Sequence, residues 1–136
     1  MDEAKDELIA SLREFGGDAL RDAWLFDEET HESLYVREDV ERRVADVDVS
    51  GYLDNERYGY VTRRTFEELH YTGYNYTVRG FDAFTQFRTF LLAGDRRIGL
   101  LASFDPGENY DFDDLSNRIE DLAEGADRLE LGGSGG

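Results

Sequence analysis

The segment that begins at Gly73 limits the possible folds most strongly, because its apolar residues recur with a period of two. Such alternation is typical of a β-strand whose side chains point to two different faces. Two more strands are expected at 87–92 and 98–104, and the pair Gly94–Asp95 predicts a turn between them. We therefore expect three consecutive antiparallel strands here. The apolar residues of the alternating strand are Tyr74, Tyr76 and Val78.

The N-terminal part of the chain predicts a helix followed by a hairpin. Four apolar residues fall on one stripe of an amphipathic helix, and the pair Gly16–Gly17 is suited to end it. Two short apolar runs, 20–26 and 33–36, then flank a polar stretch at 27–32, which is typical of two strands joined by a turn. The residues of the helical stripe are Leu8, Ile9, Leu12 and Phe15.

Helical spacing returns in the middle of the chain, from Val40 to His70. Gly51 and Gly59 weaken this pattern and favour two short helices over one long helix. A last amphipathic helix is predicted at the C-terminal end, with Asp111 as its capping residue. Its apolar stripe consists of Phe112, Leu115, Ile119 and Leu122.

These elements predict an α+β domain with the order α-β-β-α-β-β-β-α. Consecutive antiparallel strands favour a single five-stranded sheet, and flanking helices must cover at least one of its faces. We expect one domain over residues 1–128. Residues 129–136 are expected to form a flexible Gly/Ser tail, whose composition is also that of an artificial linker.

The element order resembles the roadblock and profilin-like architecture, in which helices sandwich a five-stranded antiparallel sheet. PAS-like and GAF-like sensor domains are similar at the same coarse level. This resemblance rests on topology alone and carries no residue signature. Proteins of the roadblock type usually dimerise and scaffold or regulate GTPases, so the resemblance implies a binding role.

A second resemblance rests on residues. The segments 32–40, 76–81 and 98–106 are similar to a family of small, acidic, uncharacterised haloarchaeal proteins, and the likeness covers roughly residues 19–106. That family has no assigned activity to transfer. It implies a halophilic archaeal source and leaves the chemistry open.

Charge gives an independent indication of the same environment. The chain has 32 acidic residues against 15 basic ones, a net charge of -17, and Lys5 is its only lysine. Such a surface repels itself at low salt, whereas molar salt shortens the Debye length to about 3 Å. We therefore expect a halophilic, cytoplasmic protein; an acidic mesophilic protein is the alternative. The same charge argues against nucleic-acid binding, and no apolar run is long enough to span a membrane.

Catalytic signatures are missing from the sequence. There is no cysteine, and the two histidines, His31 and His70, lie among acidic residues. An enzyme that uses His70 with Glu67 or Glu68 is a minor alternative. The acidic cluster around Asp111 is better explained as helix capping than as a cation site. We expect no catalytic residues, no metal and no cofactor.

The aromatic residues between 71 and 90 suggest a binding function. Most are expected in the core, but rings on both faces of a sheet require cover on both faces or a partner. Tyr74 and Tyr76 are expected to share a face. We predict a non-enzymatic adaptor or regulatory domain, acting by protein–protein contact as a homodimer; the alternative is a PAS/GAF-like small-molecule sensor. The interface candidates are Tyr71, Tyr74, Tyr76, Arg79 and Arg88.

Overall fold

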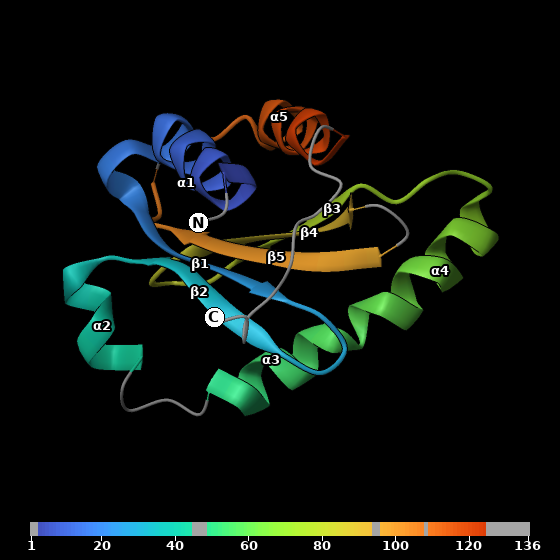
Figure 1. The fold of residues 1–136 in the computed structure, drawn as a ribbon, viewed down its shortest axis with the longest axis horizontal. Helices are drawn as coiled ribbons and strands as arrows, with labels where there is room; N and C mark the ends of the chain where they lie inside the picture. The colour runs from blue at the N-terminus through green and yellow to red at the C-terminus, as the bar shows by residue number, and fades with distance from the viewer. Residues whose placement is uncertain (1–2, 45–48, 94–95, 108, 125–136) are drawn as a thin grey trace.

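The computed structural model describes residues 3–44, 49–93, 96–107 and 109–124. Its elements follow one another as helices and strands in the predicted order (Figure 1). They are α1 (Glu3–Gly16), the short 3-10 turn η1 (Gly17–Ala19), β1 (Leu20–Phe26), β2 (His31–Val36), α2 (Glu38–Val44), α3 (Val49–Arg57), α4 (Gly59–His70), β3 (Tyr76–Gly80), β4 (Thr85–Ala93), β5 (Arg96–Phe104) and α5 (Phe112–Glu124).

The five strands form one sheet in the order β2-β1-β5-β4-β3. Every neighbouring pair is antiparallel, so the predicted α+β class with a five-stranded antiparallel sheet is confirmed. The turn expected at 94–95 lies outside the described residues, as does the tail at 129–136. The order leaves β2 and β3 at the two edges of the sheet.

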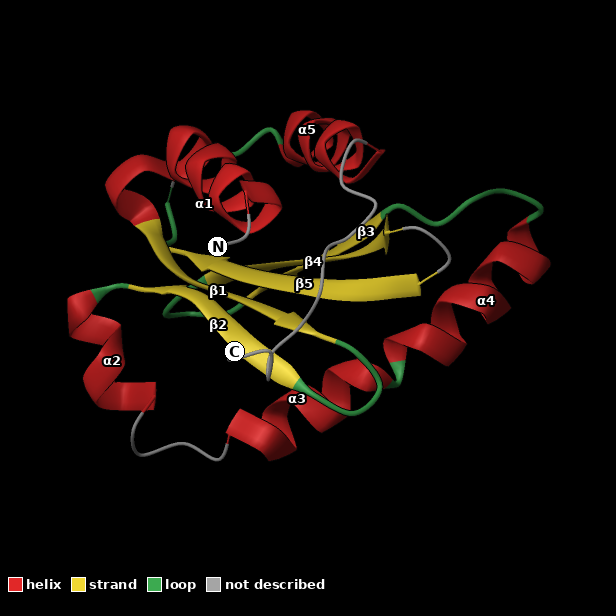
Figure 2. Ribbon diagram, viewed as in Figure 1, coloured by secondary structure: helices red, strands yellow, loops and turns green. Residues whose placement is uncertain are grey.

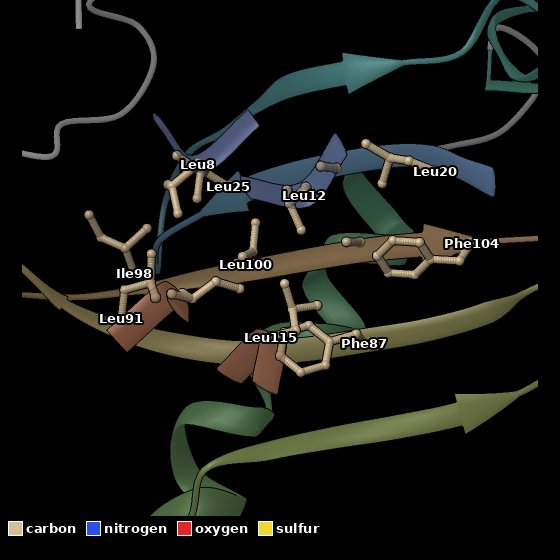
Figure 3. Close-up of a cluster of buried hydrophobic side chains, with 13 residues drawn as sticks. Leu8, Leu12, Leu20, Leu25, Phe87, Leu91, Ile98, Leu100, Phe104 and Leu115 are labelled. Carbon is tan, nitrogen blue, oxygen red and sulfur yellow. The ribbon is translucent and has the colours of Figure 1, made fainter. Parts of the chain in front are cut away.

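Helices cover the sheet on both faces. Figure 2 shows α1 and α5 on one side and α3 and α4 on the other. The larger core lies under α1 and α5, where leucines of these helices meet apolar residues of β1, β4 and β5 (Figure 3). Its members include Leu8, Leu12, Leu25, Phe87, Leu100, Phe104 and Leu115.

The opposite face has a smaller apolar core. Trp24, Phe26, Leu53 and Leu101 are buried together there. Gly99 is needed in this core, because a Cβ atom at that position would lie 2.2 Å from the ring of Phe26. This small apolar core covers only part of the sheet on this side. Polar groups, described below, contact another part of it.

The predicted helix ends agree with the structure at two places. Gly17 has a φ of 56° directly after α1, a left-handed conformation that suits glycine. The N–H of Asp114 donates to Oδ1 of Asp111 at 3.1 Å, which confirms Asp111 as the cap of α5.

The described residues of the helical middle form three helices, so the expectation of two was wrong. The last two meet at Tyr58, directly before Gly59. Gly59 is buried, and a Cβ atom there would lie 2.8 Å from the guanidinium of Arg88 and from the ring of Phe90. The sequence suggested that this glycine weakens a helix. Its role in the structure is to let the start of α4 approach β4 closely.

Candidate functional site

Exposed apolar side chains are concentrated in one part of the molecule. All seven large apolar residues that are exposed among the described residues lie between positions 58 and 81, on α4, on β3 or directly beside them. Tyr71 is 94% exposed, Val61 65% and Leu69 64%. We call this set the α4–β3 face; it wraps around the edge of the sheet, because Val78 pairs with Phe87 and so points to the side that α1 and α5 cover. Its members are Tyr58, Val61, Phe66, Leu69, Tyr71, Val78 and Phe81.

The helix α4 supplies most of this face because it packs on the sheet along one side only. Gly59 and Arg63 are its buried residues, and Tyr60 places its ring 4.6 Å from that of Phe90. On the other side of the helix, no described residue provides comparable cover, and Val61 and Leu69 are exposed. Figure 2 shows α4 running beneath the sheet and continuing toward the loop that leads into β3.

Strand β3 adds an unpaired backbone edge to the face. It pairs with β4 on one side, and in the described sheet no strand follows on the other side. An edge strand presents free N–H and C=O groups that can pair with another strand. Val78, the middle residue of β3, is 40% exposed.

Charge on this segment differs from that of the chain as a whole. Residues 58–81 contain three arginines and two glutamates and no aspartate, although the chain carries a net charge of -17. The acidic coat is therefore interrupted here. The arginines are Arg63, Arg64 and Arg79, and the glutamates are Glu67 and Glu68.

A buried ion-pair cluster ties α3 to β3 and β4. Glu56 is 3% exposed and accepts hydrogen bonds from two arginines: Nη1 of Arg79 at 2.7 Å and Nη1 of Arg88 at 3.2 Å. Nη2 of Arg88 also donates to the hydroxyl of Thr77 at 3.1 Å. One carboxylate thus neutralises two guanidinium groups only in part, and the cluster keeps one positive charge.

The loop between α4 and β3 is held against the helix by Glu67. Oε2 of Glu67 accepts the backbone N–H of Tyr74 at 3.0 Å, while Oε1 accepts a hydrogen bond from Arg63 at 2.7 Å. These contacts, the Tyr74 N–H first, hold the pKa of Glu67 below its ordinary value. The ring of Tyr74 stacks on that of Phe66, with centroids 5.7 Å apart.

A groove of about 540 Å³ lies between α4 and the strands β3 and β4. Aromatic rings line this groove together with Arg79 and Arg88. Phe66 stacks with Tyr74 and with His70, the latter at 6.3 Å between centroids. The described residues that line it are Tyr58, Gly59, Thr62, Phe66, His70, Tyr74, Thr77, Arg79 and Arg88.

The predicted interface residues are divided by the structure. Tyr71, Tyr74 and Arg79 lie on the α4–β3 side, but Tyr76 lies on the other face of the sheet. The Tyr76 ring is 5.3 Å from that of Phe87, and its hydroxyl donates to a carboxylate of α5. The expectation that Tyr74 and Tyr76 share a face was wrong, because β3 begins only at Tyr76 and Tyr74 belongs to the loop held by Glu67.

Arg88 has a different position from the one expected. It is 7% exposed, so it supports the site from inside. The sequence reasoning also missed Tyr58, Val61 and Leu69, the most exposed apolar residues of the helical region apart from Tyr71. A signal for them existed, since Val61 and Leu69 fall two helical turns apart on a side that does not face the core.

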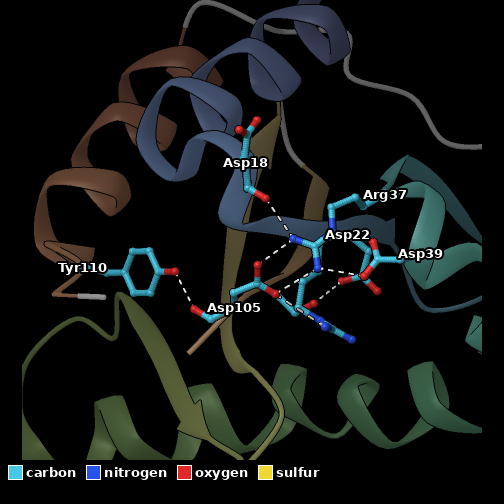
Figure 4. Close-up of polar contacts among 8 residues, drawn as sticks. Asp18, Asp22, Arg37, Asp39, Asp105 and Tyr110 are labelled. Atoms are coloured by element: carbon cyan, nitrogen blue, oxygen red, sulfur yellow. Dashed lines mark hydrogen bonds and ion pairs between the residues drawn. The ribbon is translucent and has the colours of Figure 1, made fainter. Parts of the chain in front are cut away.

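A second polar cluster joins three chain segments (Figure 4). Arg37 donates to Asp39 at 2.6 Å, to Asp105 at 2.7 Å and to the carbonyl oxygen of Asp18 at 2.9 Å. The carbonyl of Asp105 accepts the hydroxyl of Tyr110 at 2.6 Å. Because the carboxylates of Asp39 and Asp105 both face this arginine, we interpret the cluster as a structural clamp between β2, β5 and the start of β1.

This clamp predicts an acid-sensitive contribution to stability. The hydrogen bonds from Arg37 hold the pKa of Asp105 below its ordinary value of 3.8. Stability from the pair is therefore present above pH 3.8 and is lost as the pH falls through the lower folded-state pKa. We expect the loss of unfolding free energy in Asp105→Asn to be largest at neutral pH and to shrink below pH 3.8 in urea titrations. Asp121→Asn, at an exposed position of α5, is the control; an Asp105→Asn effect that is constant with pH would contradict this account.

The two histidines lie on different elements of the fold. His31 lies on β2, 6.2 Å from the ring of Trp24, and His70 is exposed at the end of α4. Within the described ranges, no three His, Cys, Asp or Glu side chains are grouped as metal ligands. In the same part of the chain, every helix is too short or too polar to cross a membrane.

Comparison with known proteins places the chain in two ways. A family model described as "Domain of unknown function (DUF7522)" matches residues 6–124. No curated protein matches the sequence. Solved structures of MglB share the fold, which confirms the predicted roadblock-like architecture.

Three MglB structures illustrate that likeness. MglB of Myxococcus xanthus has a TM-score of 0.61 at 11% identity, and the match covers 97% of both chains. The gliding protein MglB of Thermus thermophilus has a TM-score of 0.55 at 15% identity, with 91% of both chains covered. An MglB structure described as having a tetrameric arrangement has a TM-score of 0.56 at 13% identity, covering 94% of this chain and 90% of that one. At these identities the likeness concerns the fold alone.

Proposed function

Because this chain belongs to the DUF7522 family, whose description assigns no activity, we propose a function from its own surfaces: it is a non-enzymatic adaptor or regulatory domain. It acts by protein–protein contact and forms a homodimer through the α4–β3 face. It works in the cytoplasm of a halophilic archaeon. The observation that carries the proposal is that all seven exposed large apolar residues of the described chain lie within residues 58–81, on or beside α4 and β3.

Exposed apolar surface of this kind requires cover. Scattered single apolar residues are normal on a protein surface, whereas a concentrated group marks an interaction site. Tyr58, Val61, Leu69 and Tyr71 each expose most of their side chains. Burying a side chain of this size stabilises a complex by about 1.5–3 kcal/mol, so a contact that covers several of them from both copies provides a strong driving force.

The unpaired edge of β3 favours a second copy of the same chain as the partner. Two β3 strands can pair antiparallel about a twofold axis, each supplying the N–H and C=O groups that the other lacks. Such an interface is closed, because the same edge is used by both copies. Because the exposed apolar residues of α4 belong to the same α4–β3 face as β3, pairing of the two β3 strands would also bring the two α4 helices together.

Charge explains why this face, and not another, would join two acidic molecules. Each copy carries a net charge of -17, so most pairs of surfaces repel. Residues 58–81 have more arginines than acidic residues, and concentrated salt would screen the remaining repulsion. The acidic coat elsewhere would oppose unspecific contacts.

Sedimentation equilibrium in molar KCl tests the proposed dimer. The chain has a mass of 15.6 kDa. We expect the measured mass to be twice that value at micromolar concentration. A mass equal to that of one chain over the whole accessible concentration range would overturn the proposal.

A further inference from the structure

We propose that the groove between α4 and strands β3 and β4 binds a small planar anion, such as an aromatic carboxylate. The groove shares Tyr58 and Phe66 with the α4–β3 face, but all of its lining residues belong to one chain, so ligand binding does not require a second copy. The groove has the dimensions for such a ligand: its volume of about 540 Å³ lies within the range of small-molecule pockets in proteins.

The walls of the groove suit a flat apolar group. The rings of His70, Phe66 and Tyr74 form one stack, with interplanar angles of 23° and 11°. The side chain of Tyr58 borders the same groove. Aromatic faces of this kind favour offset stacking with a planar ligand over contact with a flexible aliphatic one.

The charges of the groove suit an anion. The chain has 32 acidic residues, yet none is among the described residues that line the groove. Arg79 and Arg88 do line it, and both share the single buried carboxylate of Glu56 behind them. The cluster therefore retains one positive charge in a partly desolvated position, where electrostatic attraction is stronger than in water.

The two arginines also have donors to offer. Nε of Arg88 is buried and has no hydrogen-bond partner among the described residues. The hydrogen bonds of Arg79 within that part of the chain use its Nη1 alone, to Glu56 and Gln86, and its side chain is 34% exposed. A carboxylate can accept two parallel N–H bonds from one guanidinium. Arg79 is therefore the residue that we assign to the ligand's charge.

Calorimetric titration with naphthoate and with naphthamide, its neutral analogue, tests the assignment. Both probes offer the same rings to the aromatic wall, and only naphthoate offers a charge to Arg79. We expect naphthoate to bind about tenfold more tightly, the difference between a charge-assisted and a neutral hydrogen bond. Equal affinity for the two probes, or binding of neither, would overturn the proposal.

Three variants locate the site. Arg79→Gln should remove the preference for naphthoate and leave the binding of naphthamide unchanged. Thr62→Glu, at an exposed position that lines the groove, should have the same effect without disturbing the Glu56 cluster. Arg64→Gln removes an equal charge from an exposed position of α4 that is not among the lining residues. If Arg64→Gln weakened naphthoate binding as much as Arg79→Gln, general electrostatics would replace the groove as the explanation.

The mass of each sample, measured in the same buffer, separates this inference from the proposed function. A dimer that does not prefer naphthoate would remove the ligand site and leave the dimer proposal intact. A monomer that prefers naphthoate would remove the dimer proposal and leave the ligand site intact.

Discussion

Replacing Glu56 with alanine is expected to lower the unfolding free energy by about 3–5 kcal/mol, the usual cost of removing one partner from a buried ion pair. Glu56 is 3% exposed and accepts hydrogen bonds from Arg79 and Arg88. Arg79 can turn toward solvent after the change. The side chain of Arg88 is 8% exposed, so its charge would stay buried without a counterion, and this uncompensated charge is the main source of the loss.

Urea unfolding in molar KCl measures this loss. Glu68→Ala is the matched control, because Glu68 is an exposed residue of α4 and surface substitutions usually change stability by less than about 0.5 kcal/mol. Glu56→Gln should fall between the two, since the amide oxygen still accepts a hydrogen bond. A loss in Glu56→Ala no larger than that of Glu68→Ala would show that α3 is not held to β3 and β4 by this carboxylate.

The double variant Val61→Glu, Leu69→Glu is expected to weaken the proposed dimer by at least about 100-fold, which corresponds to the loss of one central contact of an interface. Both residues expose more than half of their side chains on α4. In a twofold contact each substitution is present twice, so four carboxylates would enter one apolar region. The folded monomer should be unaffected, because neither side chain belongs to the described cores.

Sedimentation and far-UV circular dichroism together test this variant. We expect the helical signal to be retained while the mass falls from that of two chains to that of one. Ala10→Glu, at an exposed position of α1, adds charge far from the α4–β3 face and should leave the dimer intact. A dimer that survives in Val61→Glu, Leu69→Glu would place the contact elsewhere.

The sheet could be predicted from the sequence because its signals are local. Strands β1, β4 and β5 each contain a short apolar run, and the period of two marks β3. The start of β3 could not be predicted in the same way. Tyr74 continues the alternation in the sequence, but Glu67 captures its N–H and Phe66 stacks on its ring. Both partners belong to another element, so the alternation alone could not exclude Tyr74 from the strand.

The candidate site was predictable only in part for a similar reason. The excess of aromatic residues pointed to the segment that carries the candidate site, and Tyr71, Tyr74 and Arg79 lie there. Arg88 was expected at a surface because arginine is usually exposed. Its burial depends on Glu56, which is 32 residues away in the sequence, and on Gly59, whose missing side chain admits the guanidinium. Contacts between residues that are so far apart in the sequence leave no periodic pattern in it.

Cross-linking of single cysteines tests the central claim, pairing of two chains through β3, most directly. The chain has no cysteine, so an introduced one is unique. Val78 is the middle residue of β3 and would lie near the twofold axis, whereas Ser33 is an exposed residue of β2 at the opposite edge of the sheet. With a short bismaleimide in molar KCl, we expect Val78→Cys to give a covalent dimer and Ser33→Cys to stay a single chain. Cross-linking of Ser33→Cys alone, of both variants equally, or of neither would contradict pairing through β3.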